Sequence, residues 1–238
     1  MLSAISEMDP VLIAAAVIPA VILMVQVYRA DRLEKEPAGI LISLLVFGVF
    51  ATALAIVTET IGENILNLLF DEINLGYLIL WNFLVVALSE EGFKFLLLRA
   101  RTWRSPNFNC QFDGVVYAVF VSLGFALWEN IGYVAMYGFG TALARAVTAV
   151  PGHACFGVFM GVWYGAARRY ANYGDPVGAR VCRRRALWAP VFIHGMYDFL
   201  ASLEVAYSGL IFIAFFVVVF LVAMRRVKIV SRNDRYIA

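Results

Sequence analysis

The feature that most constrains this chain is a succession of long apolar runs joined by short charged connections. A bilayer core is crossed by roughly 20 consecutive apolar residues in helical form. Within lipid, the backbone must satisfy its own hydrogen bonds, and uncharged runs of this length therefore predict membrane-spanning helices. Seven spans are expected, near residues 10–28, 38–58, 75–98, 113–137, 141–167, 186–203 and 205–224.

Composition agrees with this prediction, because 63% of the residues are hydrophobic and only 15% are charged. Such values exclude an ordinary soluble domain. We therefore expect one integral-membrane domain over residues 1–238, an all-α polytopic bundle surrounded by the lipid bilayer, with no nucleic-acid partner. Nothing in the sequence indicates the oligomeric state.

Basic residues alternate between connections, which predicts the orientation of the spans. The first, third and fifth connections and the C-terminal tail are rich in Lys and Arg, whereas the N-terminus and the other connections contain none. By the positive-inside rule, the N-terminus lies outside and the C-terminus in the cytoplasm, as expected of a multi-pass protein of the cytoplasmic (inner) cell membrane. The segment 58–74, which includes Glu59, extends the second span outward, lies along the outer interface, or is simply a solvated helix end.

Ionisable residues inside the predicted third span point to a function. Glu90, Glu91 and Lys94 interrupt an otherwise apolar run. A charged group at bilayer depth costs a few kcal/mol or more, and it usually marks function. Glu90 and Lys94 are one helical turn apart and can pair. Because two acids share one base, a catalytic pair is favoured over a purely structural ion pair.

Further candidates lie in three other predicted spans. Glu129 is followed by Asn130, a polar residue that could orient a neighbour, while Glu129 itself could also simply bond another helix or Arg145. The only two histidines of the chain, His153 and His194, are both intramembrane. Asp198 lies one turn after His194, where its carboxylate can fix the tautomer of the imidazole or join it as a metal ligand. We expect all of these residues to share one site.

Taken in order, these motifs resemble one known family. They are Glu90-Glu91-x-x-Lys94, Phe125-x-x-x-Glu129, the separate His153, and His194-x-x-x-Asp198, accompanied by similar stretches at 31–37, 113–118 and 129–133. The set closely resembles the PrsW family of intramembrane proteases, relatives of the CAAX prenyl endopeptidases and of abortive-infection proteins. Prenyl endopeptidases have an arginine one residue after the position of Lys94 and a histidine at the position of Glu129, so a prenylated substrate is disfavoured.

The resemblance implies an intramembrane endopeptidase that cleaves a membrane protein, such as a single-pass anti-sigma factor. Two mechanisms fit the residues, both with Glu90 as general base and with Glu91 and Lys94 tuning its charge. In the first, His153, His194 and Glu129 bind Zn²⁺ in an open three-ligand site. In the second there is no metal, and the two histidines stabilise the oxyanion. Asp198 favours the zinc mechanism, because a carboxylate can orient a metal-bound histidine.

Two other classes of function use similar residues. Buried Glu, His, Asp and Lys also build proton relays and ion pathways, so a proton- or ion-coupled transporter is the main alternative. A haem protein with His153 and His194 as axial ligands is a further one, although haem binding does not require the nearby carboxylates.

Overall fold

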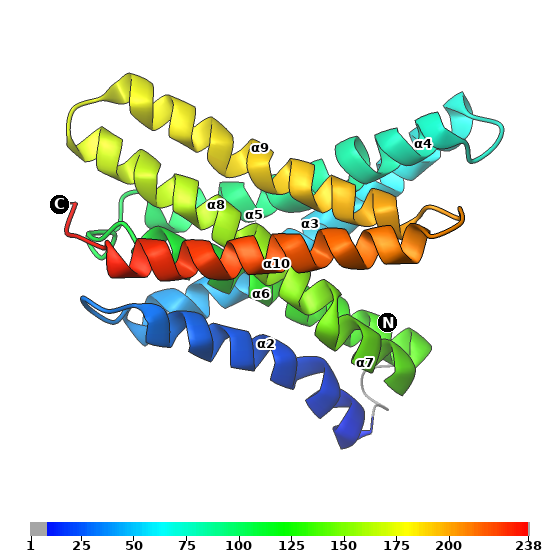
Figure 1. Cartoon of the computed structure of the whole chain (residues 1–238), viewed down its shortest axis with the longest axis horizontal. Coiled ribbons are helices and arrows are strands. Elements are labelled where there is room, and N and C mark those ends of the chain that lie inside the picture. The colour runs from blue at the N-terminus through cyan, green and yellow to red at the C-terminus, as the bar shows by residue number, and fades with distance from the viewer. Residues whose placement is uncertain (1–8, 238) are drawn as a thin grey trace.

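The computed structural model describes residues 9–237 and contains helices joined by short connections (Figure 1). The helices are α2 (Pro10–Ala30), α3 (Ala38–Leu69), α4 (Leu75–Leu80), the π-helical η1 (Trp81–Ala87), α5 (Leu88–Thr102), α6 (Asp113–Tyr137), α7 (Phe139–Val147), α8 (Ala149–Asn172), α9 (Pro176–Ala201) and α10 (Ser208–Arg232). The predicted all-α class is confirmed.

Local sequence signals explain several helix boundaries. Asp9 begins α2, because its carboxylate accepts a hydrogen bond from the backbone N–H of Val11 at 2.7 Å, and a proline follows at the first helical position. Asp175 caps α9 in the same way, again before a proline. Gly138 separates α6 from α7 with a φ of 79°, a left-handed conformation that glycine adopts without strain.

Helix α6 lies at the centre of the molecule, packed against α2, α3 and α8. Every residue from Asp113 to Ala126 is buried. Glycines permit the close approach of these helices. A Cβ atom added at Gly48 of α3 would lie 2.3 Å from the carbonyl oxygen of Val121, and one added at Gly161 of α8 would lie 2.5 Å from that of Gly114. Small residues at such crossings are typical of helices packed in membranes.

Five helices are long and apolar enough to cross a membrane among the described residues: Pro10–Ala30, Ala38–Leu69, Asp113–Tyr137, Phe139–Asn172 and Ser208–Arg232. The two remaining predicted spans, 75–98 and 186–203, are helical but belong to α4–η1–α5 and to α9, which carry the charged motifs and many arginines. The structure thus supports a multi-pass bundle, while the count of seven spans and their orientation stay predictions.

Helix α3 extends well beyond the apolar run that predicts it. It continues without a break to Leu69, so most of the segment 58–74 extends the second span rather than forming a separate interfacial helix. This extension carries Glu59 into the neighbourhood of the charged residues described below.

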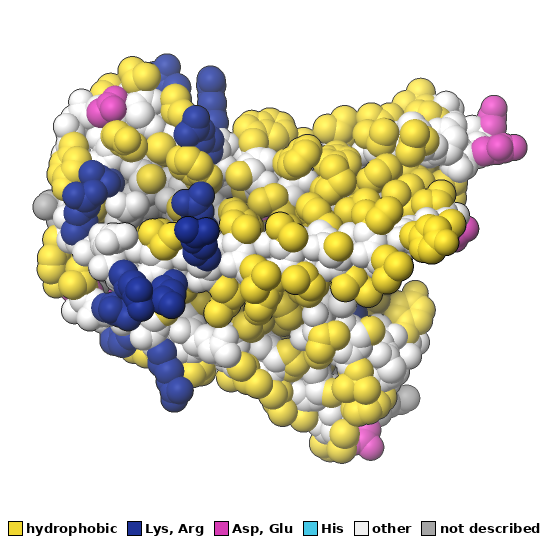
Figure 2. Space-filling model, in the orientation of Figure 1, with side chains coloured by type: hydrophobic (Ala, Val, Ile, Leu, Met, Phe, Trp, Pro, Cys, Tyr) yellow, Lys and Arg dark blue, Asp and Glu magenta, His cyan; other side chains and the backbone are white. Residues whose placement is uncertain are grey.

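Charged side chains on the surface are separated along the long axis of the molecule. On the face drawn in Figure 2, Lys and Arg gather at the end where α8 joins α9 and where α10 ends, a broad apolar surface follows, and a few acidic side chains lie at the opposite end. This arrangement is the one that the positive-inside prediction requires.

Candidate active site

The site begins at a change in helix geometry within the third predicted span. The seven-residue π-helix Trp81–Ala87 leads directly into α5, whose first turn contains Glu90 and Glu91. π-Helical segments inside α-helices occur frequently at functional sites, because the wider turn re-aims the side chains that follow. Both glutamates are buried, with 5% and 0% of their surface exposed.

Lys94 joins the two glutamates to a second helix. Its fully buried ammonium donates to Glu90 Oε2 at 3.0 Å and to Glu91 Oε1 at 2.8 Å, and it lies 3.1 Å from His153 Nδ1 of α8. The same ammonium is 3.8 Å from the centre of the Phe125 ring. The face of an aromatic ring attracts a cation, so every contact of Lys94 favours its charged form.

His194 on α9 lies between three carboxylates. Its Nδ1 is 3.0 Å from Glu91 Oε1, and its Nε2 is 3.1 Å from Asp198 Oδ2 and 4.0 Å from Glu90 Oε2. The imidazole stacks on the ring of Phe156, with centroids 4.5 Å apart and an interplanar angle of 21°. The predicted one-turn pairing of His194 with Asp198 is therefore present, and the ring orientation is fixed from several sides.

His153 completes the link to α6. Its Nε2 lies 2.9 Å from Glu129 Oε2, while its Nδ1 faces Lys94. The ring centroids of the two histidines are 5.4 Å apart. Since a lysine ammonium can only donate, Nδ1 of His153 accepts and Nε2 carries the proton that Glu129 accepts.

Arg145 from α7 holds Glu129 from the other side. One guanidinium nitrogen lies 2.9 Å from Glu129 Oε2, and Nε donates to Asn130 Oδ1 at 3.0 Å. Asn130 in turn donates to the backbone carbonyl of Ala16 at 2.9 Å, which anchors this network to α2. The sequence-based alternatives for Glu129, a bond to another helix or to Arg145, are thus both realised.

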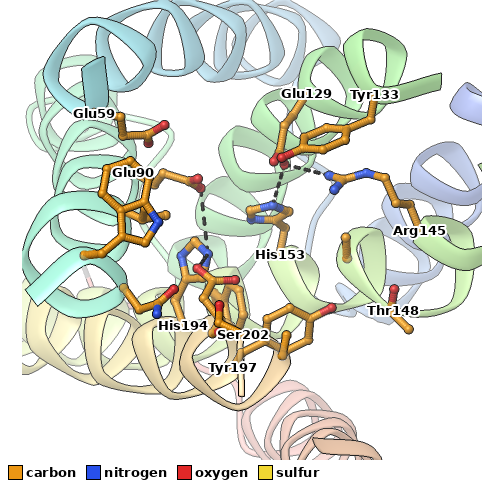
Figure 3. Close-up of a pocket in the computed structure, with 17 residues that line it drawn as sticks. Glu59, Glu90, Glu129, Tyr133, Arg145, Thr148, His153, His194, Tyr197 and Ser202 are labelled. Atoms are coloured by element: carbon orange, nitrogen blue, oxygen red, sulfur yellow. Dashed lines mark hydrogen bonds and ion pairs between the residues drawn. The ribbon is translucent and has the colours of Figure 1, made fainter. Parts of the chain in front are cut away.

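These side chains surround one cavity of about 410 Å³ (Figure 3). Glu90, Glu129, His153, His194 and Asp198 line it, whereas Glu91 and Lys94 lie behind its wall. All seven residues expected from the sequence therefore belong to one cluster built from α5, α6, α8 and α9.

Three of these residues could share a metal ion. One ligand atom each from Glu90, His153 and His194 lies within 4.8 Å of the other two. Two imidazoles and one carboxylate form the donor set of many catalytic zinc sites, which keep a further position open. Within the described residues, the four carboxylates of Glu90, Glu91, Glu129 and Asp198 share the cluster with two permanent cations, Lys94 and Arg145. A divalent ion would offset the difference in charge.

Comparison with known proteins decides the family. A model of the PrsW family of intramembrane metalloproteases matches residues 36–224. A PrsW protease of Geobacillus kaustophilus is 33% identical over 91% of both chains, and one of Oceanobacillus iheyensis is 30% identical over 93% of this chain and 97% of its own. One of Bacillus subtilis is 30% identical over 80% and 83%. The chain belongs to the PrsW family. No solved structure matches it significantly.

Family membership confirms the predicted resemblance and the assignment as an intramembrane protease, a hydrolase. It also favours proteolysis over ion transport, since the same acids and histidines now lie in a chain of a protease family. The family description as metalloproteases agrees with the Glu90–His153–His194 group, without specifying zinc.

The geometry places one predicted ligand differently. Glu129 is not part of the three-residue group, because its Oε2 is engaged with His153 and Arg145. Glu129 as a ligand and Glu90 as a free base stay predictions, and the distances favour exchanging these two roles. In the arrangement described, both ring nitrogens of each histidine have a partner, so metal binding would replace at least one of these contacts.

Sequence analysis did not assign Glu59 to the site. Its side chain lines the cavity from α3, and its Oε1 is buried with no hydrogen-bond partner among residues 9–237. The signal was an acidic residue in the outward part of an otherwise apolar helix, a pattern that a solvated helix end would also give.

Proposed function

We propose that this PrsW-family protease hydrolyses a peptide bond of a membrane-protein substrate in the cavity between α5, α6, α8 and α9. One observation carries the proposal: Glu90, His153 and His194 converge within 4.8 Å at the wall of that cavity. A hydrated pocket with buried acids and imidazoles supplies what peptide hydrolysis needs, namely a proton acceptor and groups that stabilise developing charge.

Glu90, His153 and His194 are proposed to hold Zn²⁺. When bound, the metal would activate water for attack and polarise the scissile carbonyl. Lys94 would keep Glu90 and Glu91 ionised as acceptors, and Glu91 would hold the proton of His194 Nδ1. A carboxylate that accepts from the second nitrogen of a ligating imidazole fixes the tautomer and raises the basicity of the ligand.

Glu129 is proposed as the group that accepts the proton of the attacking water. It lines the cavity, its side chain is 20% exposed, and it already receives the Nε2 proton of His153. After attack, the same carboxyl group would pass the proton to the leaving amine, as general acid–base catalysis requires. Arg145 positions Glu129 and limits its movement.

The substrate is proposed to be a single-pass membrane protein of the cytoplasmic membrane, of which an anti-sigma factor is the class that the resemblance implies. The cavity lies among helices whose outer faces carry many exposed apolar residues, and a transmembrane segment can approach such a surface within the bilayer.

The decisive experiment combines substrate cleavage with metal analysis of the purified protein. Wild type, Glu90→Gln, Glu129→Gln and the surface control Glu72→Gln are co-expressed with candidate single-pass proteins, and zinc per chain is measured by elemental analysis. We expect wild type and Glu72→Gln to give a shortened product and to hold zinc. Glu90→Gln should lose both zinc and cleavage, whereas Glu129→Gln should keep zinc and lose cleavage.

The outcome for Glu90→Gln separates the two role assignments. If this variant retains zinc at the wild-type ratio while cleavage is lost, Glu90 is the base and Glu129 is not. Full activity of metal-free wild type would exclude the metal from the mechanism altogether.

A further inference from the structure

A second group of buried acids lies far from the cavity, at the end of the molecule where the basic residues gather. Asp31 follows the last residue of α2, Glu36 lies in the connection to α3, and Asp113 is the first residue of α6. Their exposed fractions are 2%, 3% and 0%. One carboxylate oxygen from each lies within 4.8 Å of those of the other two.

In residues 9–237, no Lys or Arg side chain forms an ion pair with these carboxylates within 4.0 Å. Within residues 9–237, the ion pairs closer than 4.0 Å all belong to the catalytic cluster. Lys35, adjacent to Glu36 in the chain, instead donates to backbone carbonyls, those of Tyr28 at 2.7 Å and of Asp31. Burial of several ionised carboxylates without a counter-charge is strongly unfavourable.

The free oxygens of the group point to a missing ligand. Both carboxylate oxygens of Asp31, Oε1 of Glu36 and Oδ1 of Asp113 are buried and have no hydrogen-bond partner in the described part of the chain. Buried polar atoms are nearly always paired, so four unpaired oxygens in three neighbouring side chains require an explanation. A lack of hydrogen-bond donors in this region is not the reason, because the remaining oxygens of Glu36 and Asp113 do accept hydrogen bonds.

Those remaining oxygens are fixed by specific donors. Tyr117 donates its hydroxyl to Glu36 Oε2 at 2.5 Å, and the backbone N–H groups of Asn109 and Cys110 donate to Asp113 Oδ2 at 3.0 and 2.7 Å. Glu36 and Asp113 are thus each oriented through one oxygen while the other is left free, and Asp31 has both oxygens free. Carboxylates that bind metal ions are held by outer hydrogen bonds in this way.

We propose that Asp31, Glu36 and Asp113 bind a hard divalent cation, Ca²⁺ or Mg²⁺. Both ions take oxygen ligands, Ca²⁺ at about 2.3–2.6 Å and Mg²⁺ at about 2.0–2.1 Å, so two ligand oxygens lie no more than about 5.2 Å apart on Ca²⁺ and about 4.2 Å apart on Mg²⁺. Oxygens within 4.8 Å of one another meet the condition for Ca²⁺, and Mg²⁺ binding requires them within its shorter limit. A carboxylate-only set also distinguishes the site from the histidine-containing active site, which suits zinc.

The cation would join two segments that are distant in sequence. Asp31 and Glu36 come from the connection between α2 and α3, and Asp113 comes from the start of α6. The C-terminal segment is held beside Asp113, because Asp234 Oδ1 accepts a hydrogen bond from the backbone N–H of Phe112 at 2.9 Å. The other oxygen of this side chain, Asp234 Oδ2, is also buried and has no partner in the described part of the chain. Asp113 and Glu129 are separated by about 24 Å along α6, so this site is spatially separate from the cavity.

The test is a titration of purified full-length protein in detergent after metal removal with EDTA. CaCl₂ or MgCl₂ is added at constant ionic strength, and binding is followed by calorimetry and by the midpoint of thermal unfolding. We expect saturable binding of about one ion per chain and a rise of the midpoint for at least one of the two ions, but not for KCl. Which salt acts identifies the cation.

Variants assign the binding to this group. Asp31→Asn should lose the saturable binding and the rise in the midpoint, and Glu36→Gln gives the same test if Asp31→Asn is not recovered folded. Glu90→Gln, altered in the active site, and the exposed Glu204→Gln should bind the ion as wild type does. The proposal is overturned if wild type shows no saturable binding, if both Asp31→Asn and Glu36→Gln bind normally, or if only Glu90→Gln loses the ion.

Discussion

The two buried carboxylate clusters of this protein differ in what surrounds them. The proposed catalytic cluster combines Glu90, Glu91 and Glu129 with Lys94 and the imidazoles, and its ion pairs are direct. The acidic cluster of Asp31, Glu36 and Asp113 has no ion pair within 4.0 Å in the described chain and leaves several oxygens unpartnered. The difference teaches that one group of buried acids is neutralised by cationic side chains of the same chain, whereas the other leaves oxygens free for the proposed cation.

The sharpest way to break this comparison is to remove an imidazole from the catalytic cluster. His194→Ala deletes the partner of three carboxylates and one proposed metal ligand, so cleavage should fall by roughly 10³-fold or more. Production of the shortened substrate, quantified by immunoblot against the surface control Glu204→Gln, measures the loss. Cleavage within a few-fold of wild type would mean that chemistry takes place elsewhere.

Replacement of Lys94 should show how strongly the stability of the proposed catalytic cluster depends on the ammonium group of this residue. Lys94→Met leaves Glu90 and Glu91 buried beside each other without their ammonium, and breaking a buried pair costs about 3–5 kcal/mol. Chemical unfolding in detergent is expected to show this loss, with Lys94→Arg as a partial rescue because it restores the charge. Unchanged stability of Lys94→Met would show that the pair does not hold α5 in place.

A smaller effect is expected from the carboxylate that orients His194. Asp198→Ala removes the 3.1 Å contact with Nε2 but no group of the Glu90–His153–His194 set. In the proposed site Glu91 accepts from Nδ1, so Nε2 is the nitrogen left for the metal and Asp198 lies beside it. We expect the loss of this carboxylate to cost about 10–100-fold in metal affinity or activity, the range seen for carboxylates that support metal-bound histidines. Zinc affinity and cleavage rate should both fall in that range, and Asp198→Asn should retain more of each. A complete loss of cleavage with normal zinc affinity would instead place Asp198 at the reacting atoms.

The smallest expected effect concerns the acidic cluster, where removal of a charge should stabilise the metal-free protein instead of destabilising it. Burial raises the pKa of Asp31 to about 6 and that of Glu36 to about 7. A raised carboxyl pKa means that the folded state holds the proton more tightly, so the stability of EDTA-treated protein should decrease as pH rises from about 4 through 7. Groups that face these two are Glu34, Lys35, Asp113, Tyr117 and Asp234.

Above pH 7, Asp31→Asn should therefore stabilise the metal-free protein by an amount on the order of 1 kcal/mol, the opposite of Lys94→Met. Unfolding midpoints of wild type and variant at pH 5 and pH 8 measure this difference. If Asp31→Asn destabilises metal-free protein equally at both values, the acidic cluster is neutralised within the chain.

Prediction from sequence was most successful where a single physical requirement dominates. The apolar runs predicted all of the long helices, because an uncharged stretch of this length in lipid has little alternative to a helix. The intramembrane acids and histidines predicted the membership of the site for a similar reason, since isolated charges at that depth are too costly to occur without partners.

Prediction was weaker where several partners compete. Glu129 could pair with Arg145, with His153 or with a metal, and only the packing of α7 and α8 against α6 shows that it contacts both side chains. The contribution of Glu59 depends on α3 continuing past its apolar run, which local sequence leaves open.

The sequence by itself determined the membrane class, the helices and the set of catalytic candidates, because hydropathy and the cost of buried charge are local properties of the chain. Tertiary structure alone decided which ligand atoms meet, and it brought Asp31, Glu36 and Asp113 together from segments far apart in sequence. Distances of a few ångströms between side chains of different helices depend on how those helices pack, and helix packing is a property of the whole bundle.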